Sequence, residues 1–347
     1  MASSESIQAH LAKSLGPETH QARTALCTSL LPTLLRACAS IATTLRASHA
    51  VSAVGNQNAF GDEQLNVDVA AENVVRAALA RCPCAVTASS EEDPVEKSVQ
   101  HDNEQAAAAA ASPATSEKYT VSFDPLDGSS IIAPGWAVGT IIGIWDGETA
   151  LEQDPRTRQV AAILASYGSR NTAIVAVRIP GDASSSRTCF EVALGDDGSA
   201  TLTGGSGAAA VAYKGAAEVK TRYFAPANLR AAAESERYMD LVQHFIREKY
   251  TLRYSGGLVP DVVHALNKGH GIYMSPVTGA SQAKLRRLYE LCPVALVVEC
   301  AGGRAVDAAD GRDVLARGVR NTDERGGLVT GNKEDVEFVI GRLAGSS

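Results

Sequence analysis

Apolar residues in the N-terminal part of the chain recur at the spacing of α-helices. From Leu30 to Leu45 they return every three or four positions, which places them on one face of a helix. Pro32 stands near the start of this pattern, and because proline is tolerated in the first helical turn, we expect the regular helix to begin there. A second pattern of the same kind, through residues 74–79, predicts another helix.

Short apolar runs in the middle of the chain predict strands. Tyr119–Phe123 alternates polar and apolar residues and ends in β-branched and aromatic ones. The last third alternates helical patterns with short apolar runs, and Pro293 and Gly302 bracket one helix. This order of elements favours an α/β chain with layered sheets. Three further runs are apolar throughout and predict strands or other buried segments: Val138–Trp145, Val160–Tyr167 and Thr172–Ile179.

Three polar or low-complexity segments interrupt these patterns. Residues 1–19 are polar, and we expect them to form a poorly ordered N-terminal extension. Residues 97–117 contain a run of alanines, and residues 198–209 are rich in small residues, so both are typical of insertions. We therefore expect an N-terminal half at residues 20–220 and a C-terminal half at residues 221–347.

Charge and composition exclude several classes of function. The formal net charge is −7, with both signs spread along the sequence, so we expect no nucleic-acid partner. No uninterrupted apolar run approaches the ~18 residues of a membrane span, so we expect no membrane partner. The N-terminus does not resemble a secretory signal, and the seven cysteines are scattered. We therefore expect a reduced compartment, the cytoplasm, with a plastid or another organelle as the alternative.

Residues 123–130, Phe-Asp-Pro-Leu-Asp-Gly-Ser-Ser, carry the clearest chemical signal. Asp124 and Asp127 are two hard oxygen ligands at one turn, and the Leu126 carbonyl lies between them, a combination that suits Mg²⁺. The Gly128 amide and the two serine hydroxyls after it can hold a phosphate beside the metal. This pairing suits metal-assisted hydrolysis of a phosphate ester. The simpler alternative is an acidic turn, because Asp-Pro and Asp-Gly are common turn dipeptides.

The octapeptide resembles the signature of the fructose-1,6-bisphosphatase family, which includes the sedoheptulose bisphosphatases. The resemblance runs from about Ala25 to the C-terminus. It implies the sugar-phosphatase fold, an α/β structure layered as an αβαβα sandwich. Four other blocks resemble family segments in the same order. Gly61–Asp68 resembles a Gly-Asp-Gln stretch, and Ser90–Asp93 resembles a glutamate pair. Lys284–Glu290 resembles a Lys-Leu-Arg-x-Leu-Tyr-Glu segment, and Ala301–Gly303 resembles a Gly-Gly pair.

Within the family, the details resemble the sedoheptulose branch. Ile131 follows Asp-Gly-Ser-Ser, where fructose bisphosphatases usually have Asn, and Ser275 stands where they have a Tyr before a Pro. Tyr250–Val262 and Phe224–Ala231 are also similar to segments of that branch. The resemblance therefore implies hydrolysis of the 1-phosphate of sedoheptulose 1,7-bisphosphate to sedoheptulose 7-phosphate. A fructose 1,6-bisphosphatase or an enzyme for both sugars is the alternative.

The resemblance also implies roles for the acidic blocks. Asp68 and Glu92 would orient and deprotonate the attacking water. For Asp62 and Asp68 to serve one metal cluster, Asp62 must precede the second predicted helix and Asp68 must lie in its first turn. Clustered carboxylates raise each other's pKa until a metal binds, so activity should rise towards alkaline pH. Two or three Mg²⁺ ions, or Mn²⁺, would be held by one carbonyl and five carboxylates: Leu126, Asp62, Glu91, Asp124, Asp127 and Glu290.

The substrate-binding residues are implied in the same way. Arg253 matches a residue that in relatives reaches into the neighbouring subunit's site, so a homo-oligomer, either a dimer or a tetramer, is implied by analogy. The phosphate that is cleaved would be held by the end of the octapeptide: Asp127, Gly128, Ser129 and Ser130. The sugar and the distal phosphate would be held by residues of the C-terminal half: Asn228, Arg230, Tyr254 and Lys284.

Two other classes of function stay open. A catalytically silent sugar-phosphate sensor would keep the fold without the reaction, although every acidic position that catalysis requires is filled. An inositol-phosphatase-like enzyme would share the Asp-Pro-Leu-Asp-Gly core, but Lys284–Glu290 fits the sugar bisphosphatases better. Phosphate release from purified protein separates the sensor from the enzymes.

Overall fold

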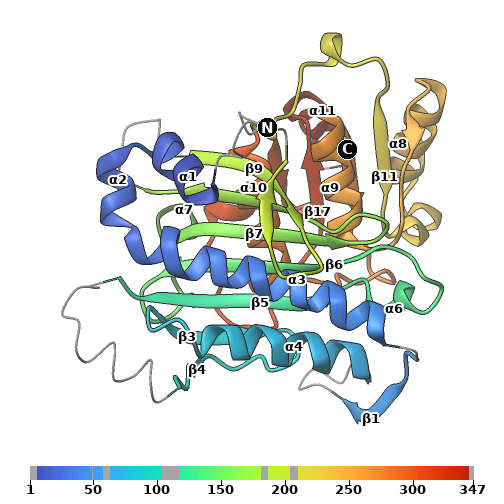
Figure 1. The fold of residues 1–347 in the computed structure, drawn as a ribbon. Helices are drawn as coiled ribbons and strands as arrows, with labels where there is room; N and C mark the ends of the chain where they lie inside the picture. Colours follow the sequence, from blue (N-terminus) through green and yellow to red (C-terminus); the bar gives the residue numbers. More distant parts are fainter. Residues whose placement is uncertain are drawn as a thin grey trace.

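Two main β-sheets, with helices outside and between them, form the layers of the fold (Figure 1), and two pairs of short strands lie outside these sheets. The computed structural model describes residues 6–48, 50–57, 63–102, 117–180, 187–203 and 210–343. The larger sheet has eight strands in the order β10-β9-β8-β7-β6-β5-β3-β4, and the smaller sheet has five in the order β12-β11-β13-β17-β15.

The larger sheet is antiparallel except where β3 runs parallel to β5. Its central strands are buried on both faces, which explains their continuous apolar runs. Along β7, for example, Ile163 packs into the core on one face and Leu164 into the core on the other. The four strands that the sequence predicts are confirmed. The strands of this sheet are β3 (Ala85–Ser90), β4 (Lys97–Ser98), β5 (Tyr119–Asp127), β6 (Val138–Asp146), β7 (Gln159–Tyr167), β8 (Thr172–Arg178), β9 (Arg187–Leu194) and β10 (Ala200–Leu202).

Two helices, α3 (Leu31–Ala47) and α4 (Asn66–Leu79), cover the outer face of the larger sheet (Figure 1). Both confirm the helices that the sequence predicts, and a π-helical turn, η1 (Leu26–Leu30), precedes α3. By length and composition the continuous segment Leu26–Ala47 is apolar enough to cross a membrane, but 67% of its apolar window is buried inside the protein. Its apolar surface is therefore largely explained by packing on the sheet.

The middle layer consists of α9 (Leu258–Lys268) and α10 (Cys292–Cys300), which lie between the two sheets. One hydrophobic cluster joins these helices to both sheets. Residues Val294–Val298 of α10 are all fully buried, as expected of a helix with neighbours on every side. The apolar run between Pro293 and Gly302 is therefore confirmed as a helix.

The smaller sheet carries α8 (Glu236–Arg247) and α11 (Lys333–Leu343) on its outer face. The order of layers is thus helices, sheet, helices, sheet, helices, which confirms the αβαβα prediction. The division into halves at residue 220 stays a prediction. The strands of the smaller sheet are β11 (Tyr223–Pro226), β12 (Thr251–Leu252), β13 (Ile272–Ser275), β15 (Arg304–Val306) and β17 (Leu328–Gly331). The short elements are β1 (Ala53–Gln57), β2 (Glu63–Leu65), α6 (Ser129–Ile132), α7 (Pro155–Arg158), η2 (Ala216–Glu218), η3 (Leu229–Ala233), β14 (Leu285–Arg286), η4 (Arg287–Leu291), η5 (Val314–Ala316) and β16 (Arg325–Gly326).

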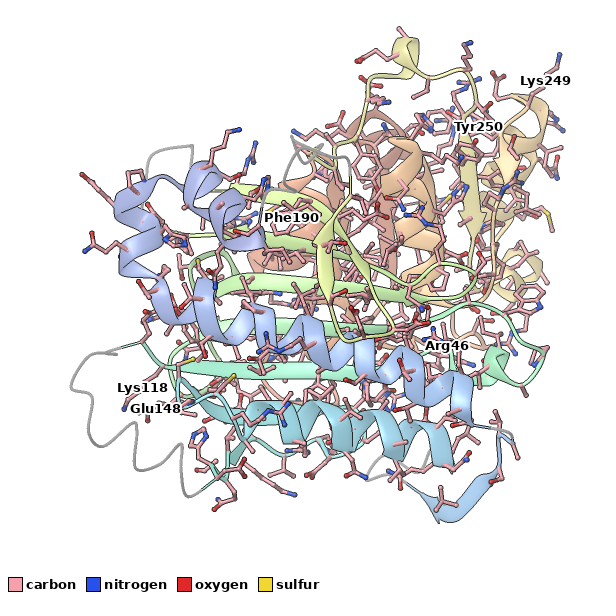
Figure 2. All side chains as sticks on the ribbon, viewed as in Figure 1. Arg46, Lys118, Glu148, Phe190, Lys249 and Tyr250 are labelled. Carbon is pink, nitrogen blue, oxygen red and sulfur yellow. The ribbon has the colours of Figure 1, made fainter. Side chains whose placement is uncertain are left out.

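The expectation of a poorly ordered extension at residues 1–19 is wrong for the residues that the structure describes. They form α1 (Ile7–Leu15) and the start of α2 (Pro17–Ala22). Apolar residues four positions apart give α1 one buried face, and Leu11 is fully buried. The ring of His10 meets that of Phe190 edge to face, with the centroids 4.6 Å apart (Figure 2 labels Phe190). A polar composition concealed this stripe.

Both predicted insertions fall at the edges of the larger sheet. Residues 103–116 and 204–209 lie outside the described residues, but the parts that are described are strands β4 and β10, at opposite ends of the sheet. An edge strand pairs on one side only, so it can be short and polar. That these two segments are insertions stays a prediction, and their described parts contribute edge strands to the larger sheet.

Gly139 of β6 allows α9 to approach the larger sheet. A Cβ atom at this position would lie 2.5 Å from Cβ of Val259 and 2.8 Å from the carbonyl oxygen of Ala165. We therefore predict that Gly139→Ala lowers the free energy of unfolding by about 1–3 kcal/mol, because an extra methyl group overpacks the core. Urea unfolding measures this change. The control is Gly341→Ala in α11, where nothing lies within 4 Å of the added atom and stability should hold or rise. Equal effects of the two substitutions would contradict the prediction.

Candidate active site

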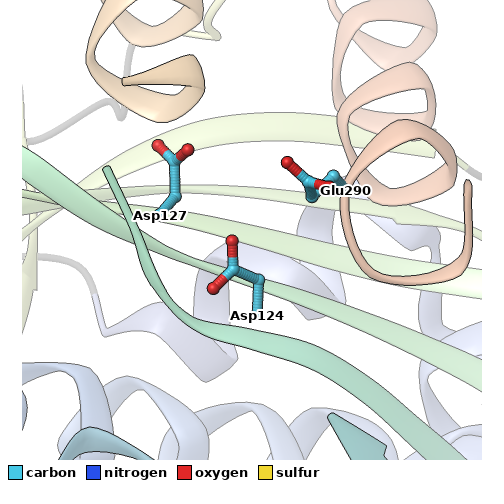
Figure 3. A group of neighbouring side chains, drawn as sticks. All are labelled: Asp124, Asp127 and Glu290. Atoms are coloured by element: carbon cyan, nitrogen blue, oxygen red, sulfur yellow. The ribbon is translucent and has the colours of Figure 1, made fainter. Parts of the chain in front are cut away.

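Asp124 and Asp127 lie at the end of β5, which continues through the octapeptide instead of ending before it. The pairing between β5 and β6 shifts between these two residues, and the irregularity brings both carboxylates to the same side of the strand (Figure 3). Pro125, between them, has no N–H to donate, but its carbonyl accepts a hydrogen bond from the Thr140 hydroxyl at 2.8 Å. The turn is therefore fixed by the neighbouring strand.

Glu290 completes the acidic cluster from a different part of the chain. It lies in the π-helical turn η4, just before α10, and points towards the two aspartates (Figure 3). One oxygen from each of Asp124, Asp127 and Glu290 lies within 4.8 Å of the others. All three side chains are buried. The predicted convergence of the octapeptide with the Lys284–Glu290 segment is therefore present in the structure.

Backbone amides hold the three carboxylates in place. Asp124 accepts from the amide of Leu126 at 2.9 Å, and Glu290 accepts from that of Arg286 at 2.5 Å. Asp127 accepts from the first two amides of α9, those of Leu258 at 3.1 Å and Val259 at 2.7 Å. Since these amides form the positive end of a helix, they stabilise a negative charge on Asp127.

Burial raises the pKa of all three carboxyl groups. For Asp124 and Glu290 the pKa is well above its usual range, first because of burial and then because of the charge on Glu91. For Asp127, burial raises the pKa to about 6, although its hydrogen bonds to α9 lower it. Buried carboxyl groups that lie this close together ionise more readily when a cation is bound beside them.

Arg286 is a site residue that the sequence analysis missed. It is buried and its guanidinium contacts Glu91, which itself lies close enough to raise the pKa of Asp124, Asp127 and Glu290. The only sequence signal was its place in the Lys284–Glu290 segment. One guanidinium beside four carboxylates leaves an excess of negative charge. A divalent cation would balance that excess, so the residues fit a metal ion.

Asp68 and Glu92 both lie close to Glu91, the residue beside this cluster, and their catalytic roles stay a prediction. Asp68 is in the first turn of α4, as predicted, and accepts from the Leu65 amide at 3.0 Å. Burial raises its pKa to about 6. Burial also raises the pKa of Glu92 to about 7, with further contributions from Asp68 and Glu91. Gln64, to which the sequence analysis gave no role, donates to Glu92 at 2.5 Å.

For two of the predicted metal ligands, Asp62 and Leu126, the structure does not test the predicted role. Asp62 lies outside the described residues, which resume at Glu63 in β2. Leu126 is buried in β5, and its amide donates to Asp124. The predicted ligand role of its carbonyl stays a prediction.

A pocket of about 340 Å³ lies beside the octapeptide and brings together most of the predicted substrate residues. No ion pair joins Arg230 or Lys284 to an acidic side chain among the described residues, so both charges are available to an anion. The Nδ2 atom of Asn228 donates to the carbonyl of Pro276 at 2.7 Å, so this side chain also holds the pocket wall. Predicted residues that line the pocket are Ser130, Asn228, Arg230, Tyr254 and Lys284.

The other predicted substrate residues lie around this pocket. Gly128 and Ser129 immediately precede Ser130 in the chain, and Gly128 has a left-handed backbone with φ +85°. Arg253 does not line the pocket. It is exposed, donates to the carbonyl of Leu252 at 2.7 Å, and its guanidinium lies 5.7 Å from the centroid of the Tyr223 ring. Among the predicted substrate residues of the C-terminal half, Arg253 is therefore the one that does not line this pocket, although its neighbour Tyr254 does.

Comparisons with known proteins agree with this geometry. Two family models match, the N-terminal domain of fructose-1-6-bisphosphatase over residues 12–184 and its C-terminal domain over residues 217–343. The chloroplastic sedoheptulose-1,7-bisphosphatase of Spinacia oleracea is 35% identical over 292 residues, which cover 84% of this chain and 67% of that protein. Two other chloroplastic relatives are matched over 66% and 58% of their length, so this chain spans two thirds or less of such proteins.

Bacterial and structural relatives point to the same family. A class 1 fructose-1,6-bisphosphatase of Syntrophotalea carbinolica is 33% identical over 82% of this chain and 79% of that protein. The crystal structure of a Toxoplasma gondii protein, provisionally assigned as a sedoheptulose-1,7-bisphosphatase, has a TM-score of 0.80 and 32% identity, with full coverage of both chains. Since the two family models together match most of this chain, the protein belongs to the fructose-1,6-bisphosphatase family, whose members are sugar bisphosphatases and thus phosphoric monoester hydrolases.

Proposed function

We propose that this protein hydrolyses the 1-phosphate of sedoheptulose 1,7-bisphosphate in a reaction that depends on Mg²⁺. The observation that carries the proposal is the buried cluster of Asp124, Asp127 and Glu290, which lies beside a pocket with two available cations. Asp127 connects the two, because it belongs to the cluster and also holds the first turn of α9 next to the pocket. A metal site beside an anion pocket is the arrangement that a sugar bisphosphate requires.

The metal would be held by Asp124, Asp127 and Glu290, with Glu91 beside them. When bound, Mg²⁺ supplies charge to the phosphoryl oxygens and lowers the pKa of a bound water. Hard oxygen ligands of this kind suit Mg²⁺ or Mn²⁺. Arg286 would orient Glu91 through its direct contact.

Proton transfer falls to Glu92 and Asp68. Hydrolysis breaks the bond between phosphorus and the sugar oxygen, while the attacking water loses a proton and the sugar oxygen gains one. The raised pKa of Glu92, about 7, suits it to accept a proton near neutral pH. Asp68 lies close enough to raise that pKa and has its own at about 6, so it is placed to orient the same water.

The ends of the substrate would bind on two sides of the pocket. The Ser129 and Ser130 hydroxyls and the Gly128 amide would hold the phosphate that is cleaved, next to Asp127. Arg230 and Lys284 would hold the distal phosphate, since both are exposed, line the pocket and carry charges that are available to an anion.

Fructose 1,6-bisphosphate is the second candidate substrate. Both kinds of bisphosphatase occur among the relatives at similar identity. Two features support the seven-carbon sugar: the small side chain of Ser275 in the pocket wall and the apolar Ile131 beside Ser130. We also propose a homo-oligomer, because Leu252 on the edge strand β12 and Arg253 directly after it are exposed, where a second subunit could reach them.

Replacing one carboxylate should abolish the reaction and leave the fold intact. For Asp124→Asn we predict that phosphate release from sedoheptulose 1,7-bisphosphate with Mg²⁺ falls by more than about 100-fold, since even partners outside the ligand shell are often worth 10–100-fold. The control is Asp240→Asn, on the exposed face of α8, which should keep wild-type activity.

The same assay, run with both sugars, decides the substrate. A higher kcat/KM for the seven-carbon sugar supports the proposal, and equal values would assign both sugars to the enzyme. If folded wild-type protein released no phosphate from either sugar, the catalytic proposal would fail and the sensor would remain.

The buried carboxyl groups also predict how pH affects stability. Because folding raises the pKa of Asp68, Asp127 and Glu92 to about 6 or 7, the metal-free folded state holds more protons than the unfolded state between about pH 4 and pH 7. Its free energy of unfolding should therefore fall as the pH rises through this range. Mg²⁺ binds the ionised groups, so it should raise Tm more at about pH 8 than at about pH 5. A larger Mg²⁺ effect at the lower pH, measured by calorimetry, would contradict this account.

A further inference from the structure

The Ile131 side chain lies close to three glycines from two segments of the chain. A Cβ atom placed on Gly128, Gly256 or Gly257 would lie 3.4 Å from a different carbon of the Ile131 side chain in each case: Cγ1, Cγ2 and Cδ1. An added methyl group at any of these positions would be in ordinary van der Waals contact with Ile131, so the isoleucine side chain lies close beside all three glycines. Gly256 has φ +102°, a backbone conformation that favours glycine, so a larger residue at this position would be strained.

The two segments that surround Ile131 are fixed to each other. Gly128 follows β5, whereas Gly256 and Gly257 precede α9. Asp127 joins the segments through its hydrogen bonds to the amides at the start of α9. The amide of Ile131 also donates to the carbonyl of Gly128 at 2.9 Å. The backbone of Ile131 is therefore fixed relative to both segments.

Ile131 forms an apolar part of the wall of the 340 Å³ pocket. It follows Ser130, which also lines the pocket and is proposed to bind the cleaved phosphate. The sugar carbons nearest that phosphate would therefore lie against its side chain. Arg230 and Lys284, which also line the pocket, would hold the other phosphate.

From this geometry we infer that Ile131 determines which sugar bisphosphate the site prefers, an inference that rests on the proposed function. An apolar wall offers no hydrogen bond to a sugar hydroxyl, so it selects by shape and contact. Ser130 would hold one phosphate and Arg230 with Lys284 the other, and a seven-carbon sugar must fit one more carbon between the two phosphates than a six-carbon sugar. Its chain must bow further towards the wall, and it therefore gains more contact with Ile131.

The test compares kcat/KM for sedoheptulose 1,7-bisphosphate and fructose 1,6-bisphosphate in each variant. For Ile131→Ala we expect the ratio of the two values, seven-carbon over six-carbon, to fall about tenfold, the lower end of what apolar pockets discriminate. The side chains introduced by Ile131→Val and Ile131→Thr have nearly the same shape, but threonine has a hydroxyl group where valine has a methyl group. If contact with an apolar wall sets the preference, the ratio should fall further for Ile131→Thr than for Ile131→Val.

The matched control is Ile132→Ala, on the same helical turn. Ile132 is also half-buried, but it lines a different pocket, together with Leu45 and Val67. Its substitution should leave the ratio unchanged even if it weakens the turn, and thermal unfolding of each variant reports any loss of folding. Wild-type activity with an unchanged ratio in Ile131→Ala would overturn this inference alone. A wild-type protein that cleaves neither sugar would overturn the proposed function, and the inference with it.

Discussion

Asp127 holds the first turn of α9 with both oxygens of its carboxylate. This contact joins the larger sheet to the helical layer between the sheets, because Asp127 ends β5 and α9 packs across β6. It also places the 340 Å³ pocket beside the acidic cluster, since the loop before α9 carries Tyr254 and Gly256 of the pocket wall. Gly139, which pairs with Asp127 across the sheet, leaves the room that α9 needs for this approach.

Without a bound cation, keeping the carboxylates of the acidic cluster ionised inside the fold costs free energy. Burying an unbalanced charge is unfavourable, and the raised pKa values of Asp124 and Glu290 express that cost. The fold reduces it in part with backbone amides and with Arg286 beside Glu91. What remains is negative charge in a fixed place, which gives a divalent cation its affinity. The same burial moves the pKa of Glu92 to about 7, where it can exchange a proton.

Local patterns predicted much of this fold, and the resemblance predicted much of the site. The helices α3 and α4 and the strands β5–β8 follow directly from apolar spacing, because each buries a continuous face. Two things were not visible in the sequence. The helix α1 was missed because its polar composition hid a single buried stripe, and Arg286 was missed because an arginine in a charged segment is usually exposed. Its guanidinium contacts Glu91, which is far away in the sequence.

The most direct test of the account is to locate the metal. Crystals grown with Mn²⁺ and measured for anomalous scattering would show where a divalent cation binds. The account predicts a peak among the carboxylates of Asp124, Asp127 and Glu290, and its loss in Asp124→Asn crystals. A peak elsewhere, or no peak in crystals of protein that hydrolyses sugar bisphosphates with Mn²⁺, would contradict the assignment of this cluster as the catalytic metal site.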